Sequence, residues 1–157
     1  MRKSIVLLAV SLLVLCACAE RFDKGTEEKA IQTLIDQYHE ALGNEDMDTI
    51  STLIAHDDDM IVFHAGGRIT TGWNEFESTA QRLFDKAENL EINSRNEIIK
   101  VHNSGTAAWV SFIQYGSFAR NQPVHNWRAT WVLEKRNGRW VNVHAHYSGL
   151  PAELLDE

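Results

Sequence analysis

Histidine is the side chain best suited to proton transfer or metal binding near neutral pH, and two histidines lie close together near the C-terminus of this sequence. His144 and His146 alternate along an apolar segment, so on a strand both would project from the same face. Such a pair could share a zinc ion if His125 or His102 supplied a third ligand. A subunit interface or structural hydrogen bonding is the alternative, which we favour. We therefore predict no metal site and no cofactor.

A second candidate for proton transfer is His64, which precedes the Gly66-Gly67 pair. Its neutral imidazole could act as a general base, although a partly exposed histidine beside a turn is the simpler interpretation. Arg68, across that turn, could orient a ligand or pair with the acidic run at residues 57–59. This run lacks the alternating oxygen ligands of a calcium loop, so we expect it to be a solvated helix end.

Several tyrosines and tryptophans could form the wall of a pocket. Buried phenol and indole groups need hydrogen-bond partners, so these residues could line a pocket, although a plain core would use the same residue types. Tyr115 and Tyr147 join His64 as candidate proton carriers in catalysis. The sequence holds no nucleophile elbow, phosphate loop or dinucleotide fingerprint, and no cysteine after Cys18. The expected wall residues are Tyr38, Trp73, Tyr115, Trp131 and Tyr147.

The first half of the chain, which must position these groups, has a helical pattern. We expect Thr26 to be the N-cap of a helix ending at Gly43, because two glutamates follow it and apolar residues recur at helical spacing. A shorter helix is expected to begin near Asp46. A third should begin after Gly72, with apolar residues at helical spacing as far as Phe84.

The second half has the pattern of strands. A short apolar strand at residues 60–64 and a return strand at 68–71 flank the Gly66-Gly67 turn. Asn137-Gly138 is a strong hairpin signal between the last two of four long strands. These long strands are expected at residues 90–101, 106–118, 125–136 and 139–148.

Alternation along the long strands separates two faces. We expect the more apolar set to face the helices, and the other set is aromatic enough to suggest a partner subunit. The predicted inward set is Trp109, Ser111, Ile113, Tyr115, Trp127, Ala129, Trp131, Leu133, Val141, Val143, Ala145 and Tyr147. The predicted outward set includes Trp140, Asn142, His144, His146 and, on the second strand, Val110, Phe112 and Gln114.

The N-terminus has the order of an export signal. Arg2 and Lys3 precede an apolar run of about a dozen residues, too short for a membrane-spanning helix of roughly 20 residues. Cleavage after residue 17 leaves 140 residues, with 13 basic and 22 acidic side chains and a net charge of −9. This size suits one domain, and the acidic balance argues against nucleic acid as a partner.

The string Leu15-Cys16-Ala17-Cys18 resembles the bacterial lipobox. The resemblance implies a signal peptide at residues 1–17, a lipidated Cys18 with a tether at residues 18–25, and a folded domain at residues 26–157. The alternative is an ordinary cleaved signal with both cysteines discarded. The expected localisation is the cell envelope, with the membrane as partner through the lipid anchor. In a cell with two membranes we expect the outer one, with the domain facing the periplasm.

The order of elements resembles the nuclear-transport-factor-2-like fold, shared with ketosteroid isomerase and SnoaL-like cyclases. The segment Gly138-Arg139-Trp140-Val141-Asn142-Val143-His144-Ala145-His146-Tyr147-Ser148-Gly149-Leu150-Pro151 is similar to the end of the calcium/calmodulin-dependent kinase II association domain and its bacterial SnoaL-like relatives. The resemblance covers residues 26–151. It implies an α+β fold, in which a cone-shaped, mainly antiparallel sheet of about six strands wraps around three helices.

That resemblance also implies a pocket between the sheet and the helices, with His64 near its mouth. Three arginines receive carboxylates in the kinase domain, and the matching positions here are Ser111, Trp131 and Tyr147. An acidic ligand would lose its main attraction, so a neutral or aromatic ligand is expected. His144, His146 and Trp140 are placed on the convex face, where a homodimer or larger assembly would form.

Two functions follow as hypotheses. The one we favour is a lipid-anchored module that binds a small neutral or aromatic molecule or assembles with itself, without catalysis. The alternative is an isomerase, cyclase or hydrolase of the SnoaL or ketosteroid isomerase kind, in which His64, Tyr115 or Tyr147 moves a proton. No carboxylate base can be assigned to the inner sheet face from the sequence.

Overall fold

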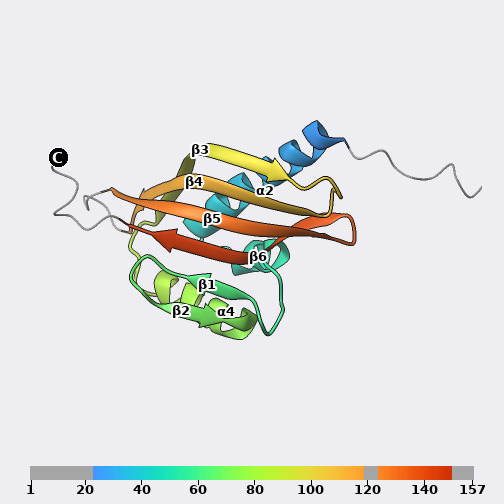
Figure 1. The fold of residues 1–157 in the computed structure, drawn as a ribbon. Helices are drawn as coiled ribbons and strands as arrows, with labels where there is room; N and C mark the ends of the chain where they lie inside the picture. The colour runs from blue at the N-terminus through green and yellow to red at the C-terminus, as the bar shows by residue number, and fades with distance from the viewer. Residues whose placement is uncertain (1–22, 119–123, 150–157) are drawn as a thin grey trace, which may run out of the picture.

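A six-stranded curved sheet covers the long N-terminal helix in the computed structural model, which describes residues 23–118 and 124–149 (Figure 1). The strands lie in the order β2-β1-β6-β5-β4-β3, and the helices are on one side of the sheet. The predicted α+β fold class is confirmed. The proposed signal peptide and Cys18 lie outside the described residues. No helix in the described part of the chain has the length and apolar character needed to cross a membrane.

Three helices form as the apolar spacing predicts. They are α2 (Lys24–Gly43), α3 (Met47–Leu53) and α4 (Gly72–Phe84). The predicted N-cap of the first helix is wrong. Asp23 is the N-cap, because its carboxylate accepts hydrogen bonds from the Gly25 backbone N–H at 3.1 Å and the Thr26 hydroxyl at 2.6 Å.

The strands follow the predicted order, and one of their pairings is parallel. The short β1 (Ile61–Phe63) pairs antiparallel with β2 (Ile69–Thr71) and parallel with β6. This parallel pairing, which the sequence did not indicate, joins the hairpin to the main sheet. The remaining neighbours are antiparallel. The four long strands are β3 (Glu91–Val101), β4 (Ala107–Ser117), β5 (His125–Arg136) and β6 (Arg139–Ser148).

The predicted facing is correct for β5 and wrong for β4. On β5, Ala129, Trp131 and Leu133 are buried beneath the helices. On β4, Val110 and Phe112 are buried instead of the predicted set, and Trp109 is 49% exposed. Both faces of β4 have apolar side chains, so alternation alone could not assign the inner one.

A β-bulge in β6 brings residues of both predicted faces to the inside. Val132 pairs with His144 and Leu133 pairs with Asn142, which leaves Val143 as one extra residue. Trp140 and Asn142 are therefore buried on one side of the bulge, and Ala145 on the other. The prediction that Trp140 lies on the outer face is wrong, because its indole Nε1 donates to Glu27 on α2 at 2.8 Å.

The backbones of β3 and β4 approach each other very closely at Gly116, which pairs with Ile92. A Cβ atom at this position would lie 2.0 Å from the Glu91 backbone oxygen and 2.8 Å from Ile92 Cδ1. Only glycine permits this approach of the two backbones.

Candidate functional site

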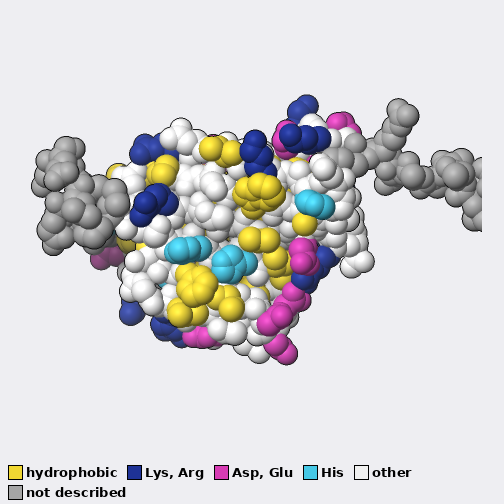
Figure 2. Space-filling view, in the orientation of Figure 1, with side chains coloured by type: hydrophobic (Ala, Val, Ile, Leu, Met, Phe, Trp, Pro, Cys, Tyr) yellow, Lys and Arg dark blue, Asp and Glu magenta, His cyan; other side chains and the backbone are white. Residues whose placement is uncertain are grey.

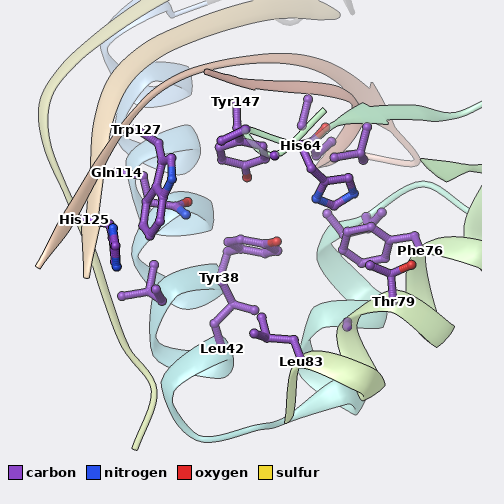
Figure 3. A pocket seen from close by; sticks show the side chains of 18 of the residues that line it. Tyr38, Leu42, His64, Phe76, Thr79, Leu83, Gln114, His125, Trp127 and Tyr147 are labelled. Atoms are coloured by element: carbon purple, nitrogen blue, oxygen red, sulfur yellow. The ribbon is translucent and has the colours of Figure 1, made fainter. Parts of the chain in front are cut away.

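A cavity of about 490 Å³ lies between the inner face of the sheet and helices α2 and α4 (Figure 3). Its volume is within the range of small-molecule sites. Among the described residues that line it there is no Asp, Glu, Lys or Arg. An uncharged wall disfavours a charged ligand, because desolvating an ion without a partner costs far more than desolvating a neutral molecule. The aliphatic wall includes Leu42, Ile54, Met60, Val62, Leu83 and Ile92.

Two tyrosines place hydroxyl groups beside each other in this wall. Tyr38 projects from α2 and Tyr147 from β6 (Figure 3). The Tyr147 oxygen accepts a hydrogen bond of 2.9 Å from Nε1 of Trp131, which is fully buried behind it. Burial raises the pKa of Tyr38 to about 12 and also raises the pKa of Tyr147, with the neighbouring Tyr38 as a second cause. Both phenols are therefore protonated hydrogen-bond donors at neutral pH.

His64 lies across the cavity from these tyrosines (Figure 3). The β1–β2 turn holds it in place, because its backbone N–H donates to the Arg68 carbonyl at 2.8 Å and its Nε2 is 3.2 Å from the Thr70 hydroxyl. Burial lowers its pKa, and the positive charge of Arg68 lowers it further. The imidazole is therefore neutral at pH 7 and able to accept a proton.

Gln114 faces the cavity from β4, although alternation predicted the opposite face. Its Oε1 is 3.3 Å from Nε2 of His39, a residue of α2 that is only 5% exposed. Burial lowers the pKa of His39, and the hydrogen bond with Gln114 and the charges of Asp36 and Glu97 oppose this effect only in part. His39 itself is not part of the cavity wall but lies beside a second hollow that contains both acids.

Asn142 is a further cavity residue that the sequence did not reveal. The bulge turns its side chain inward, and the residue is 3% exposed. Its backbone oxygen accepts from the Ala55 N–H at 2.8 Å, and its side-chain amide is part of the cavity wall. An amide in a cavity wall is available to a bound molecule or to water.

An aromatic wall completes the cavity beside β5. Trp127 lies 5.6 Å from both His125 and Phe118, measured between ring centroids. All three residues line the cavity, and the Trp127 ring lies along its side in Figure 3. Trp127 was predicted to face inward, whereas Phe118 and His125 were not assigned to a pocket. Flat aromatic surfaces of this kind favour a planar apolar ligand.

The structure brings together only part of the predicted wall. Tyr38, His64 and Tyr147 line the cavity, with Trp131 directly behind Tyr147. Ser111 and Tyr115 are on the outer face of β4, because the facing of this strand is reversed. Trp73 stacks on His56 at a centroid distance of 4.0 Å, away from the cavity wall.

The remaining candidate residues lie elsewhere. Arg68 pairs with Glu75 of α4 at 3.6 Å and not with the acidic run, whereas Asp57 of that run binds Arg136. His144 and His146 face outward on either side of Phe63, each with a ring centroid 5.7 Å from that of the phenylalanine. In the described part of the chain, no three His, Cys, Asp or Glu side chains gather in a group that could hold a metal ion.

Comparison with known proteins agrees with this fold. A SnoaL-like domain family matches residues 31–153, which include most of the helices and the entire sheet. The chain belongs to the SnoaL-like domain family. No curated protein matches the sequence significantly.

This SnoaL-like domain is similar in structure to several bacterial proteins. A nuclear-transport-factor-2-like protein from Salmonella enterica is 21% identical, with a TM-score of 0.74 over 86% of this chain and 99% of the other. A candidate dehydratase from Streptomyces avermitilis is 17% identical, with a TM-score of 0.71 over 83% and 100%. A candidate ketosteroid isomerase from Shewanella frigidimarina is 21% identical, with a TM-score of 0.63 over 76% and 94%. These likenesses establish the fold and leave the activity to the site itself.

Proposed function

We propose that this SnoaL-like domain binds a small, uncharged and largely apolar molecule in the cavity. The observation that supports the proposal is a wall of described residues without charged side chains that still contains polar groups, among them the inward-facing amide of Asn142. The apolar surface would supply most of the affinity, and the few polar groups would orient the ligand. A carboxylate or ammonium ligand would find no partner of opposite charge in this wall.

Native mass spectrometry of the chain from residue 19 tests this proposal. Every described helix and strand lies beyond residue 23, so this chain includes the whole fold. We expect a reproducible small mass bound to the protein purified from the cell. The matched variant is Ala80→Trp, in which a large side chain from α4 occupies the cavity. Retention of the same mass by a folded Ala80→Trp variant would place the ligand elsewhere and contradict the proposal.

A second candidate function is proton transfer by His64. Its neutral imidazole faces the same cavity as the protonated Tyr38 and Tyr147, so a base and at least one phenol donor surround one space. Two structural neighbours are named for isomerase and dehydratase chemistry. Tyr115 is no longer a candidate, because it lies on the outer face. Once a turnover assay exists, an unchanged rate in His64→Gln would refute this function.

We also propose that the domain is exported and anchored to the membrane through Cys18. The basic start, the apolar run and the lipobox-like string support this proposal. Metabolic labelling with a fatty-acid analogue should mark the wild-type chain and leave Cys18→Ser unlabelled. Label retained by Cys18→Ser would refute the anchor.

Self-association through the outer sheet face is the last part of the proposal. Trp109 on β4 pairs with Val132 on β5, which pairs with His144 on β6, and His146 on β6 pairs with Phe63 on β1. Figure 2 shows apolar and histidine side chains grouped on this face. Trp109, Val132 and Phe63 are each more than one-third exposed, and apolar patches of this kind are typical of interfaces. A second copy of the same face is the expected partner, because these apolar side chains carry no charge that would repel it.

A further inference from the structure

The direction of the hydrogen bond between His39 and Gln114 determines what Gln114 offers to a ligand. The Gln114 Oε1 atom can only accept, so His39 Nε2, 3.3 Å away, must be the donor. The neutral imidazole therefore has its proton on Nε2. With its oxygen occupied in this way, the Gln114 carboxamide has its two N–H donors left for the cavity that it lines.

A second buried group fixes the direction of the tyrosine hydrogen bonds. An indole N–H can only donate, so Trp131 Nε1 makes the Tyr147 oxygen an acceptor at 2.9 Å. The proton of Tyr147 must then point to the neighbouring Tyr38 oxygen or into the cavity. In either case at least one phenol O–H is left for the cavity that both tyrosines line, because two hydroxyl groups can form at most one hydrogen bond with each other.

From the directions of these two hydrogen bonds we infer that the cavity recognises a neutral hydrogen-bond acceptor, such as the carbonyl oxygen of a planar ketone. His39 is a positioning residue for this specificity. The inference rests on the proposed ligand-binding function. His39 and Trp131 fix the donors from behind the wall without lining the cavity themselves. The absence of Lys and Arg from the described lining residues favours a carbonyl over a carboxylate as the acceptor. Trp127 provides the flat surface for an attached ring.

Two near-isosteric probes separate this inference from simple apolar binding. The probes are 2-acetylnaphthalene, which has one carbonyl acceptor, and 2-isopropylnaphthalene, which has none. We expect the wild-type chain from residue 19 to bind the ketone about tenfold more tightly, the ratio that one net hydrogen bond of ~1.4 kcal/mol produces. Displacement of a fluorescent reporter or calorimetry gives both dissociation constants.

Three variants identify the source of the preference. Gln114→Leu removes the donor, and His39→Phe releases the carboxamide so that its oxygen can turn to the cavity. Both are expected to lower the preference to about twofold or less, since a net hydrogen bond is lost. His39→Gln keeps an N–H donor near the position of Nε2 and should restore the preference. Far-UV circular dichroism verifies that each variant is folded. If the His39→Phe variant does not fold, Gln114→Leu remains as the test.

The outcomes are distinct. Tight binding of both probes with equal affinity would overturn the inferred specificity while the proposed binding function stands. Binding of neither probe would count against the proposed function and the inference together. A tenfold preference that survives in folded His39→Phe would overturn the role of His39, and one that survives in Gln114→Leu would overturn that of Gln114.

Discussion

The two neighbouring tyrosine hydroxyl groups in the cavity wall should contribute very differently to the free energy of unfolding. Tyr147→Phe removes the acceptor of the Trp131 Nε1 proton, and Trp131 has no exposed surface. A buried donor left without a partner lowers the free energy of unfolding by about 1–3 kcal/mol. Tyr38→Phe leaves the bond between Trp131 and Tyr147 intact, and the Tyr147 O–H can turn to the cavity that it lines. Its free energy of unfolding should remain within about 0.5 kcal/mol of the wild-type value.

Urea denaturation followed by far-UV circular dichroism measures both changes and avoids the altered tryptophan signal. The midpoint should fall for Tyr147→Phe with an unchanged slope, because the surface exposed on unfolding is nearly the same. Tyr38→Phe should instead reduce the affinity for 2-acetylnaphthalene, since it removes a donor at the cavity. Equal stability of the two variants would refute the reasoning, because the buried indole would then not depend on Tyr147.

Further predictions concern Gly116, the buried His39 and Val132 on the outer face. Gly116→Ala should lower the free energy of unfolding by at least ~1–3 kcal/mol in urea titrations, because its Cβ would collide with the Glu91 backbone oxygen, and a wild-type midpoint would exclude that close approach. The pKa of His39 is below its ordinary value of 6.5, so the unfolded chain takes up this proton first as the pH falls. Stability should therefore be full above about pH 6.5 and decline below it, with a smaller decline in His39→Gln; identical pH profiles would contradict this. Val132→Glu should convert a dimer to a monomer in light scattering without loss of fold, and a wild-type monomer would refute the proposed interface.

Local signals in the sequence predicted most of the fold. The helix at Lys24–Gly43 follows from apolar spacing, and the hairpin between β5 and β6 follows from Asn137-Gly138, which adopts positive φ angles of 51° and 79°. The N-cap was misplaced by three residues, because Asp23 and Thr26 are both good capping residues and only the backbone distinguishes them. The parallel pairing of β1 with β6 depends on contacts distant in sequence, which no local pattern contains.

The site was less predictable, because strand facing determines which residues line it. On β5 one face is clearly more apolar, and Trp127 and Trp131 were assigned correctly. On β4 both faces are apolar, so Ser111 and Tyr115 were placed inside and Gln114 outside, the reverse of the structure. The aromatic Trp109 on the outer face strengthened that error. A half-buried polar residue such as Gln114 is more stable with a partner, and its partner His39 lies 75 residues earlier in the chain.

The bulge at Val143 links the stability of the fold to the chemistry of the cavity. A regular strand would place alternate residues inside, so Trp140 and Asn142 could not share the inner face with Ala145 and Tyr147. One extra residue changes this, because the strand resumes its alternation in the opposite phase beyond Val143. The first half of β6 then binds α2 through Trp140 and Glu27, while the second half receives the Trp131 hydrogen bond at Tyr147. The amide of Asn142 is turned inward by the same extra residue, so a feature of the backbone, and not a sequence motif, places this polar group in the cavity wall.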